Sequence, residues 1–175
     1  MLKRKKGKRG ISVIIGYLLL VSFAIIISGM VYVWMKTYVP TEKIECPDGV
    51  SIYIKEANCS LNGTNYILEL TLKNNGRFNI AGFYIHASND SSQEIATINL
   101  ADKINDSGVK FGETILFNIG NSNTLKINKE KTITFILEEE IFLLSIIPTR
   151  FNEIEGKTKY VGCNNGKARE LIDCS

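Results

Sequence analysis

Residues 11–35 read ISVIIGYLLLVSFAIIISGMVYVWM, and this stretch decides how the N-terminal part of the chain folds, because it contains no charged residue. An α-helix of this length spans roughly 37 Å, which exceeds the ~30 Å hydrocarbon core of a bilayer. Tyr32 and Trp34 suit a membrane–water interface, and Pro40 discourages further helix. The stretch therefore predicts a membrane-spanning helix over residues 11–38.

A basic head precedes this helix and consists of Lys3, Arg4, Lys5, Lys6, Lys8 and Arg9. The positive-inside rule keeps such a head in the cytoplasm, so we expect residues 41–175 to face outward. The whole chain has a net charge of +3, and without these six positive charges the remainder carries −3. A mildly acidic main body argues against a nucleic-acid partner. An ordinary secretion signal has an apolar core of only about 7–15 residues, so we expect this longer helix to be retained.

Small residues recur along the apolar stretch at spacings of four or seven: Ser12 with Gly16, Ala24 with Ser28, and Ser22 with Gly29. Such spacing lets apolar helices approach one another closely, which predicts packing against other helices. The alternative is that any apolar stretch of this length contains a few small residues.

The residues around the start of the helix also resemble a known family. Arg9-Gly10-Ile11-Ser12, followed by ISVIIGYLLLV over residues 11–21, is similar to the prepilin-peptidase site of archaeal type IV pilins and archaellins. The resemblance implies that a membrane peptidase cleaves after Gly10, removing residues 1–10. The helix would then hold the subunit in the membrane and later bundle with other copies. Bacterial relatives carry glutamate at the fifth mature position, here Ile15, and its absence points toward the archaeal branch.

The pattern changes from Val50 onward, where short stretches rich in Ile, Leu, Thr, Phe and Tyr alternate with turn residues such as Asn62-Gly63. Leu68, Leu70 and Leu72 would share one face of a strand. The predicted strands cover 51–57, 66–73, 78–87, 94–100, 113–119, 131–139, 141–150 and 158–162. They predict an antiparallel β-sandwich over residues 50–175, with a linker at 39–49 and a short helix at 167–172.

Within this region, LTLKNNGRFNIAGFYI over residues 70–85 resembles the strand–turn–strand of immunoglobulin-like domains in archaeal pilins. The expected fold class is therefore an N-terminal hydrophobic transmembrane α-helix followed by an all-β immunoglobulin-like sandwich. In the Asn75-Gly76 turn we expect glycine to adopt the positive φ that a tight reversal requires.

Four cysteines follow the apolar stretch: Cys46, Cys59, Cys163 and Cys174. An even count in an exported domain favours two disulfides over free thiols, and the spacing does not match a zinc site. An extended strand over residues 50–57 would hold Cys46 and Cys59 roughly 30 Å apart, too far to bond. The remaining pairings join the first strand to the C-terminal tail. On the immunoglobulin-like resemblance, we expect Cys59 to pair with Cys163 and Cys46 with Cys174.

The polar residues of the domain suggest modification more than catalysis. Four N-x-S/T sequons are candidate glycosylation sites: Asn58, Asn62, Asn89 and Asn105. The chain has a single histidine, His86, within a predicted strand, and the acidic run 138–140 is typical of a solvated strand edge. No phosphate-binding, dinucleotide-binding or nucleophile-elbow motif occurs in the sequence. We therefore expect no enzyme activity, no cofactor and no metal.

The resemblance to archaeal type IV pilins, together with these patterns, implies a structural subunit of an archaeal type IV pilus-like surface filament that serves adhesion or motility. Its expected partners are the membrane, a prepilin peptidase and further copies of the same chain through the N-terminal helix. It would be a single-pass membrane protein with an extracellular domain before it enters the filament. The alternative is an uncleaved, membrane-anchored immunoglobulin-like binding module that does not polymerise. A minor pilin that primes or tips a filament is an intermediate possibility.

Overall fold

In the computed structural model the chain divides into two compact units, Met1–Lys43 and Ile44–Ser175, each described here by itself. The structure describes residues 9–38, 45–105, 108–154 and 156–174. Most of the predicted basic leader and residues 39–44 of the predicted linker lie outside these ranges.

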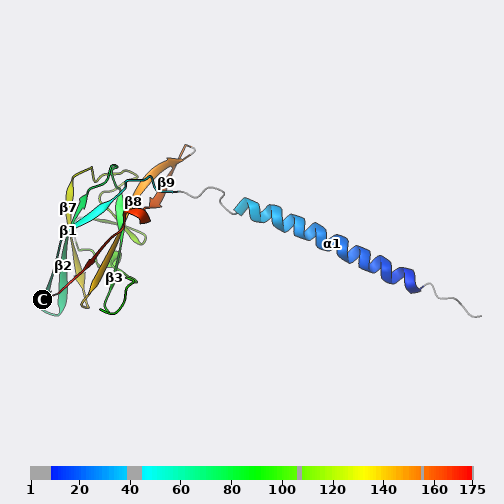
Figure 1. Cartoon of the computed structure of the whole chain (residues 1–175), viewed down its shortest axis with the longest axis horizontal. Coiled ribbons are helices and arrows are strands. Elements are labelled where there is room, and N and C mark those ends of the chain that lie inside the picture. The colour runs from blue at the N-terminus through cyan, green and yellow to red at the C-terminus, as the bar shows by residue number, and fades with distance from the viewer. Residues whose placement is uncertain (1–8, 39–44, 106–107, 155, 175) are drawn as a thin grey trace, which may run out of the picture. The chain divides into compact units, whose positions relative to one another are not determined.

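The first unit is one long helix, α1 (Arg9–Tyr38) (Figure 1). Its residues are apolar on every side, because no charge occurs between residues 11 and 35. No acidic residue lies in its first turn, whereas Lys36 lies in its last turn, where a positive charge interacts favourably with the helix dipole. The long apolar helix predicted from the sequence is therefore confirmed.

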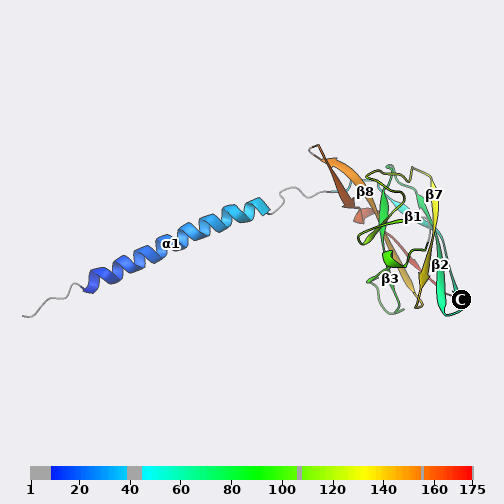
Figure 2. The ribbon, with the colours of Figure 1, turned by 180° about the vertical axis from the view of Figure 1, so that it is seen from behind.

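The second unit contains two antiparallel sheets. In Figures 1 and 2 the first sheet lies on one side of the domain, with β3 and β8 of the second sheet on the other. The first sheet has the order β1 (Ile52–Asn62), β2 (Asn65–Asn74) and β7 (Glu130–Leu137). The second has the order β10 (Ala168–Leu171), β8 (Leu143–Ile154), β3 (Gly82–Ser88), β6 (Thr114–Leu116) and β5 (Val109–Phe111). It is extended by β4 (Ile98–Asn99) beside β3 and β9 (Lys157–Gly162) beside β8. Short 3-10 turns occur at η1 (Ala101–Lys103) and η2 (Asn164–Gly166).

A single main core lies between the sheets. Leu68, Leu70 and Leu72 of β2 are fully buried, which confirms that they share one inward face. They belong to the same buried cluster as side chains of the second sheet: Phe83, Ile85, Ile115, Leu144 and Ile146. Two sheets that enclose one core are the arrangement of a β-sandwich, so a β-rich domain of this general kind follows the helix.

Two asparagine–glycine turns use glycine for different reasons. At the tip of the β1–β2 hairpin, Gly63 has φ +67°, the left-handed conformation that a tight hairpin turn requires. The prediction of a positive φ at Gly76 is wrong, because its φ does not lie in that region. A Cβ atom at Gly76 would instead lie 2.6 Å from the carbonyl oxygen of Gly49. The glycine is needed there because two backbone segments approach closely.

The predicted helix at residues 167–172 is also wrong. This segment forms β10, which pairs antiparallel with β8 from Ala168 opposite Ile146 to Leu171 opposite Leu143. A single isolated helical turn is unstable because nucleation fixes several residues for one hydrogen bond. The long strand β8 offers backbone partners over the whole segment, so the strand is favoured.

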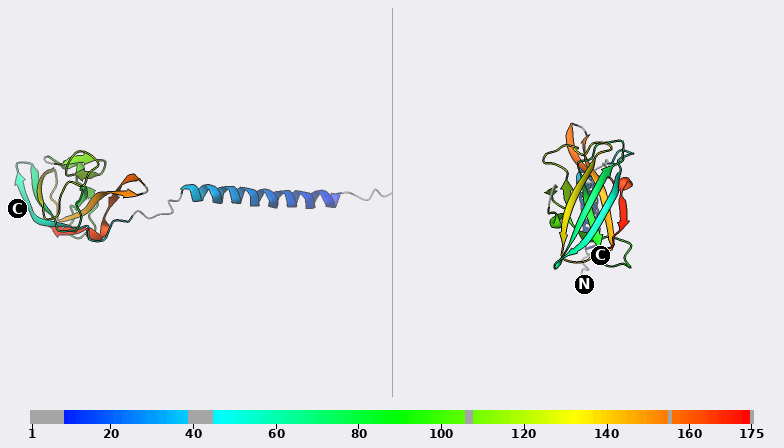
Figure 3. Two further views of the ribbon diagram at one scale, coloured as in Figure 1. Left: turned by 90° about the horizontal axis from the view of Figure 1, so that it is seen from above. Right: turned by 90° about the vertical axis from the view of Figure 1, so that its left-hand side faces the viewer.

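The strand register defines two opposite ends of the β-domain (Figure 3). At the entry end, β1 begins opposite the end of β2, and β7 begins beside them at Glu130. The same end receives the tip of the β8–β9 hairpin. At the far end, the β1–β2 turn lies near the C-terminal tail, and Ser88 of β3 pairs with Leu143 of β8.

Candidate functional site

Residues Val13–Tyr38 of α1 are long and apolar enough to cross a membrane, as judged by length and composition. The segment has 26 residues and spans about 39 Å as a helix. The backbone of the predicted processing residues, Arg9, Gly10, Ile11 and Ser12, forms the first turn of the same helix. A peptidase that acted here would therefore cut at the very start of the apolar helix.

Three hydroxyl groups within α1 are satisfied inside the helix itself. The Ser22 hydroxyl donates to the Leu18 carbonyl oxygen at 2.8 Å, and the Ser28 hydroxyl donates to the Ala24 carbonyl oxygen at 2.7 Å. The Thr37 hydroxyl donates to the Val33 carbonyl oxygen at 3.1 Å. Apolar surroundings penalise an unpaired hydroxyl, so these bonds adapt the helix to lipid or to a packed apolar core.

The small residues of α1 face several directions. At about 100° per residue, Ser22 and Gly29 lie on one side, Ala24 and Ser28 on a second, and Gly16 on a third, roughly a third of a turn apart. A Cβ atom added at Gly16 or Gly29 would meet nothing within 4 Å in the same chain. Close approach is therefore open on several sides of the helix, in contrast to the single seam of a simple dimer.

Aromatic residues and one lysine gather at the C-terminal end of α1. The Trp34 and Tyr38 rings lie 4.8 Å apart, and the Lys36 ammonium lies 5.4 Å from the centroid of the Tyr32 ring. Rings of this kind, together with a lysine, are enriched where a helix leaves the hydrocarbon for the headgroup region. This end of α1 is thus suited to a membrane interface.

The domain has two disulfides, and their pairing differs from the prediction. Cys46 bonds to Cys163, with Cα atoms 5.2 Å apart, and Cys59 bonds to Cys174, with Cα atoms 4.5 Å apart. The expected pairs, Cys59 with Cys163 and Cys46 with Cys174, are therefore wrong. The prediction that disulfides join the N-terminal region of the domain to its C-terminal tail is confirmed. None of the four cysteines is free.

The direction of the C-terminal tail explains the correct pairing. A parallel bridge joins Cys59 to Cys174, and Gly166 lies so close to the Val50 carbonyl that a Cβ atom there would clash with it. The tail from residue 163 to 174 therefore runs alongside β1 in the same direction. Parallel segments pair their cysteines in order, first with first and last with last. The predicted nested pairing would require antiparallel segments.

All four sequon asparagines, Asn58, Asn62, Asn89 and Asn105, are exposed. Asn58 lies on β1 and Asn62 at its last position, beside the hairpin turn. The Asn89 side chain donates to the Glu139 carboxylate at 2.8 Å, and the Asn105 backbone N–H donates to the Thr134 carbonyl oxygen. The strand register places all four in the half of the domain toward the far end.

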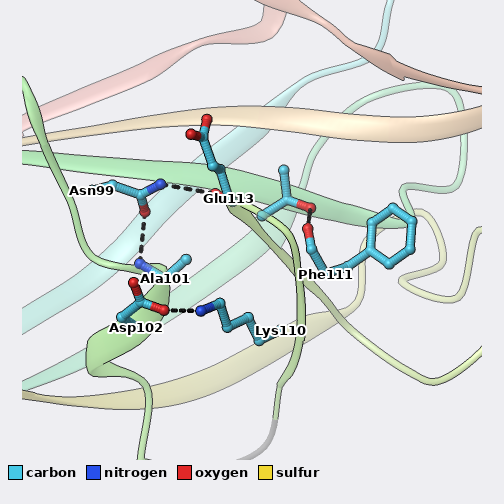
Figure 4. A network of polar contacts seen from close by, with 7 residues as sticks. Asn99, Ala101, Asp102, Lys110, Phe111 and Glu113 are labelled. Atoms are coloured by element: carbon cyan, nitrogen blue, oxygen red, sulfur yellow. Dashed lines mark hydrogen bonds and ion pairs between the residues drawn. The ribbon is translucent and has the colours of Figure 1, made fainter.

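The polar residues considered for chemistry do not converge. His86 is a half-buried residue of β3, opposite Asn99 and Ser145. Figure 4 shows that Asp102 pairs with Lys110 while the Asn99 side chain bonds the backbone of Ala101 and Glu113. Among the described residues, no group of three or more His, Cys, Asp or Glu side chains is placed to hold a metal ion. The network in Figure 4 joins β4, η1 and β5.

A shallow pocket of about 220 Å³ opens at the far end. Its apolar lining comes from Ile98, Leu100, Leu137 and Ile141, and its polar lining from Asn89, Lys103, Glu138 and Glu139. Lys103 pairs with Glu138 at 2.7 Å, which lowers the pKa of that carboxyl below its ordinary value through a hydrogen bond and charge attraction. The pocket could receive one apolar side chain flanked by positive charge.

Sequence reasoning missed three structural features. The Asn74 side chain is fully buried and donates to the carbonyl oxygens of Phe78 and Leu125, while its own oxygen accepts from the Gly76 N–H. The Tyr160 hydroxyl bonds Thr149, and burial raises its pKa. The Arg150 guanidinium lies over the Phe78 ring at 4.9 Å, and burial lowers its pKa. The sequence predicts only a turn at Asn74-Asn75-Gly76, although the position of Asn74 at the end of a buried strand is a signal for a buried side chain.

Comparison of the chain with protein-family models, with curated proteins and with solved structures gives no match.

Proposed function

We propose that the chain is a pilin-like structural subunit of an archaeal type IV pilus-like surface filament, with an immunoglobulin-like outer domain. The observation that carries the proposal is α1, which is uncharged from residue 11 to 35 and begins at the Arg9-Gly10-Ile11 segment. A helix without a polar face is suited to lipid or to a bundle of like helices. Small residues that face several directions favour the bundle, because each helix in a filament core has neighbours on more than one side.

Removal of the basic head has a physical purpose in this proposal. The six positive charges before Gly10 would carry a large desolvation cost inside an apolar filament core. Cleavage after Gly10 leaves Ile11 as the first residue, so the core receives only the apolar helix. The membrane holds the precursor with its head in the cytoplasm, and the β-domain lies outside.

The β-domain supports a role at the cell surface. Its two disulfides suit an oxidising exterior, where small exported domains use them for stability. Its exposed sequons are compatible with glycosylation there. Coating the apolar core with such domains would give the filament its adhesive or protective surface.

The test is N-terminal sequencing of the protein in material sheared from the surface of cells that express the full chain with a prepilin peptidase. The expected sequence begins at Ile11. Gly10→Leu should block processing and leave Met1 as the N-terminus, whereas the matched control Gly7→Leu lies in the discarded head and should be processed normally. Recovery of unprocessed protein only in the membrane fraction would contradict the proposal and favour an anchored binding module.

A further inference from the structure

Positive and negative side chains are distributed unevenly between the two ends of the β-domain. At the entry end, cations outnumber acids, with Lys55, Lys73, Arg77, Lys126, Lys129, Lys131, Arg150, Lys157 and Lys159 against Glu45, Asp48, Glu130 and Glu153. At the far end, acids outnumber cations, with Asp90, Glu94, Glu138, Glu139, Glu140, Glu170 and Asp173 against Lys103 and Arg169. These sets are taken from the described residues, and Glu56, Glu69, Asp102, Lys110, Glu113 and Lys167 are in neither set. The two ends therefore carry opposite net charge.

The shapes of the two ends are complementary as well. At the entry end, Ile127 is 44% exposed on a tight turn, in which the Lys129 N–H donates to the Lys126 carbonyl oxygen and Asn128 has φ +60°. This turn presents one apolar side chain between two lysines. At the far end, the pocket described above has an apolar lining and a rim that includes Glu138 and Glu139. A lysine-flanked isoleucine matches that pocket in polarity and in charge.

From these observations we infer that the entry end of one copy docks on the far end of another, with Ile127 seated in the pocket between Leu137 and Ile141. The partner is thus a second copy of this chain, and the inference rests on the proposed filament function. A contact between two different patches of one molecule is heterologous, and such contacts generate open assemblies when they do not close a ring. Opposite charges would also steer the approach and suppress wrong orientations.

A second copy explains both ends, whereas an anionic membrane surface would explain only the basic one. Most of the charged groups involved are exposed and have no strong partner of their own among the described residues. The exceptions are Glu130, which bridges Lys55 and Lys73, and Glu138, which pairs with Lys103. Glu139 also accepts from the Asn89 amide, Asp90 accepts from Ser92, and Arg150 lies over the Phe78 ring. Charges that remain unpaired within the domain are available to a neighbour.

The test is a charge-swap complementation in cells that assemble filaments from the full chain. The basic-end variant carries Lys126→Glu and Lys129→Glu, and the acidic-end variant carries Glu138→Lys and Glu139→Lys. Each variant alone brings like charges together, so the yield of sheared filaments should fall about tenfold or more. Coexpression of the two variants should restore it, because each then meets an oppositely charged end on the other.

Three comparisons keep the result interpretable. Glu56→Lys with Glu69→Lys reverses two exposed charges on the outer face of the first sheet and should leave the yield unchanged. Ile127→Asn should lower the yield, whereas Ile127→Leu should not. Thermal unfolding of each purified variant reports folding separately, because all of the substituted charged residues are exposed.

The inference is wrong if folded single variants assemble like the wild type, or if coexpression gives no rescue. Loss in the basic-end variant alone, without rescue, would instead indicate contact with an anionic lipid surface. A different result would contradict the proposed function itself. In that case the wild-type chain would form no filaments and would retain its N-terminal head.

Discussion

The sulfur atoms of Cys46 and Cys163 are bonded although 117 residues separate them in the chain. The backbone N–H of Cys163 also donates to the Pro148 carbonyl oxygen in β8, the longest strand of the domain. The first residues of the domain are therefore attached, through one covalent bond, to the segment that follows β9 and hydrogen-bonds to β8 of the larger sheet. The Cys59–Cys174 bond repeats this attachment near the far end.

Loss of either disulfide should destabilise the domain by a similar amount. The two bonds close loops of almost the same length, 117 and 115 residues, so each restricts the unfolded chain equally. The double variants Cys46→Ser/Cys163→Ser and Cys59→Ser/Cys174→Ser should each lower the free energy of unfolding by about 2–4 kcal/mol, measured by denaturant unfolding. Non-reducing peptide mapping of the wild type should recover these two pairs. The nested pairs in that map would contradict the structure.

Removal of the Asn74 side chain should be costly. Asn74→Ala removes the side-chain donor to the Phe78 carbonyl oxygen and the acceptor of the Gly76 N–H. It also removes one of two donors to the Leu125 carbonyl oxygen, which keeps its bond from the Ile80 N–H. We expect the free energy of unfolding to fall by about 2–3 kcal/mol, measured by urea unfolding. The neighbouring exposed residue provides a control, since Asn75→Ala should change it by less than about 0.5 kcal/mol. Equal effects of the two substitutions would refute this role for Asn74.

Stability should decline in alkaline solution because of Tyr160. Burial raises the pKa of its hydroxyl, and its hydrogen bonds with Thr114 and Thr149 offset only part of this. The folded state thus holds the proton more tightly than the unfolded state, whose tyrosines titrate near pH ~10. This contribution is complete below that pH and is lost as the pH rises through the folded pKa. Urea unfolding measured from about pH 8 to about pH 11, a range that spans the ordinary tyrosine pKa of ~10, should show a steeper fall in the free energy of unfolding for the wild type than for Tyr160→Phe.

Substitution of a small residue in α1 should impair assembly and leave the monomer intact. A side chain at Gly29 meets nothing within its own chain, so Gly29→Leu should insert and be processed normally. Because close approach of a neighbouring helix would be blocked, we expect fewer sheared filaments. Ile27→Leu is a matched control of similar hydrophobicity. Normal filament yield with Gly29→Leu would show that this side of the helix has no close neighbour.

The sequons should differ in whether they carry a glycan. Asn62 is exposed at the β1–β2 turn, whereas the Asn89 amide is bonded to Glu139 within the acidic far end. We therefore expect a glycan at Asn62 and an unmodified Asn89 in sheared filaments, measured by mass spectrometry of proteolytic peptides. Asn62→Gln should remove the corresponding mass. A glycan on Asn89 in assembled filaments would conflict with the docking inferred for this end.

Local patterns predicted much of the architecture. The uncharged run of residues predicted the helix, and the alternation of apolar and polar residues predicted the buried face of β2. Both patterns can be recognised because they depend on residues that are close together in the sequence. The errors at Gly76, at residues 167–172 and in the disulfide order have a common cause. Each depends on which distant segment lies alongside, such as β8 beside β10 or the tail beside β1. The far-end pocket likewise combines residues from three separate segments, so no local sequence motif predicts it.

The covalent connectivity of the domain also bears on its survival after proteolysis. A single cut between Cys59 and Cys163 would leave one fragment with Cys46 and Cys59 and another with Cys163 and Cys174. Both disulfides would then cross between the fragments. A nicked domain would remain one molecule held by two bonds, with its N-terminal piece still attached to the helix. An exposed loop between these cysteines could thus be cleaved without release of any part of the domain.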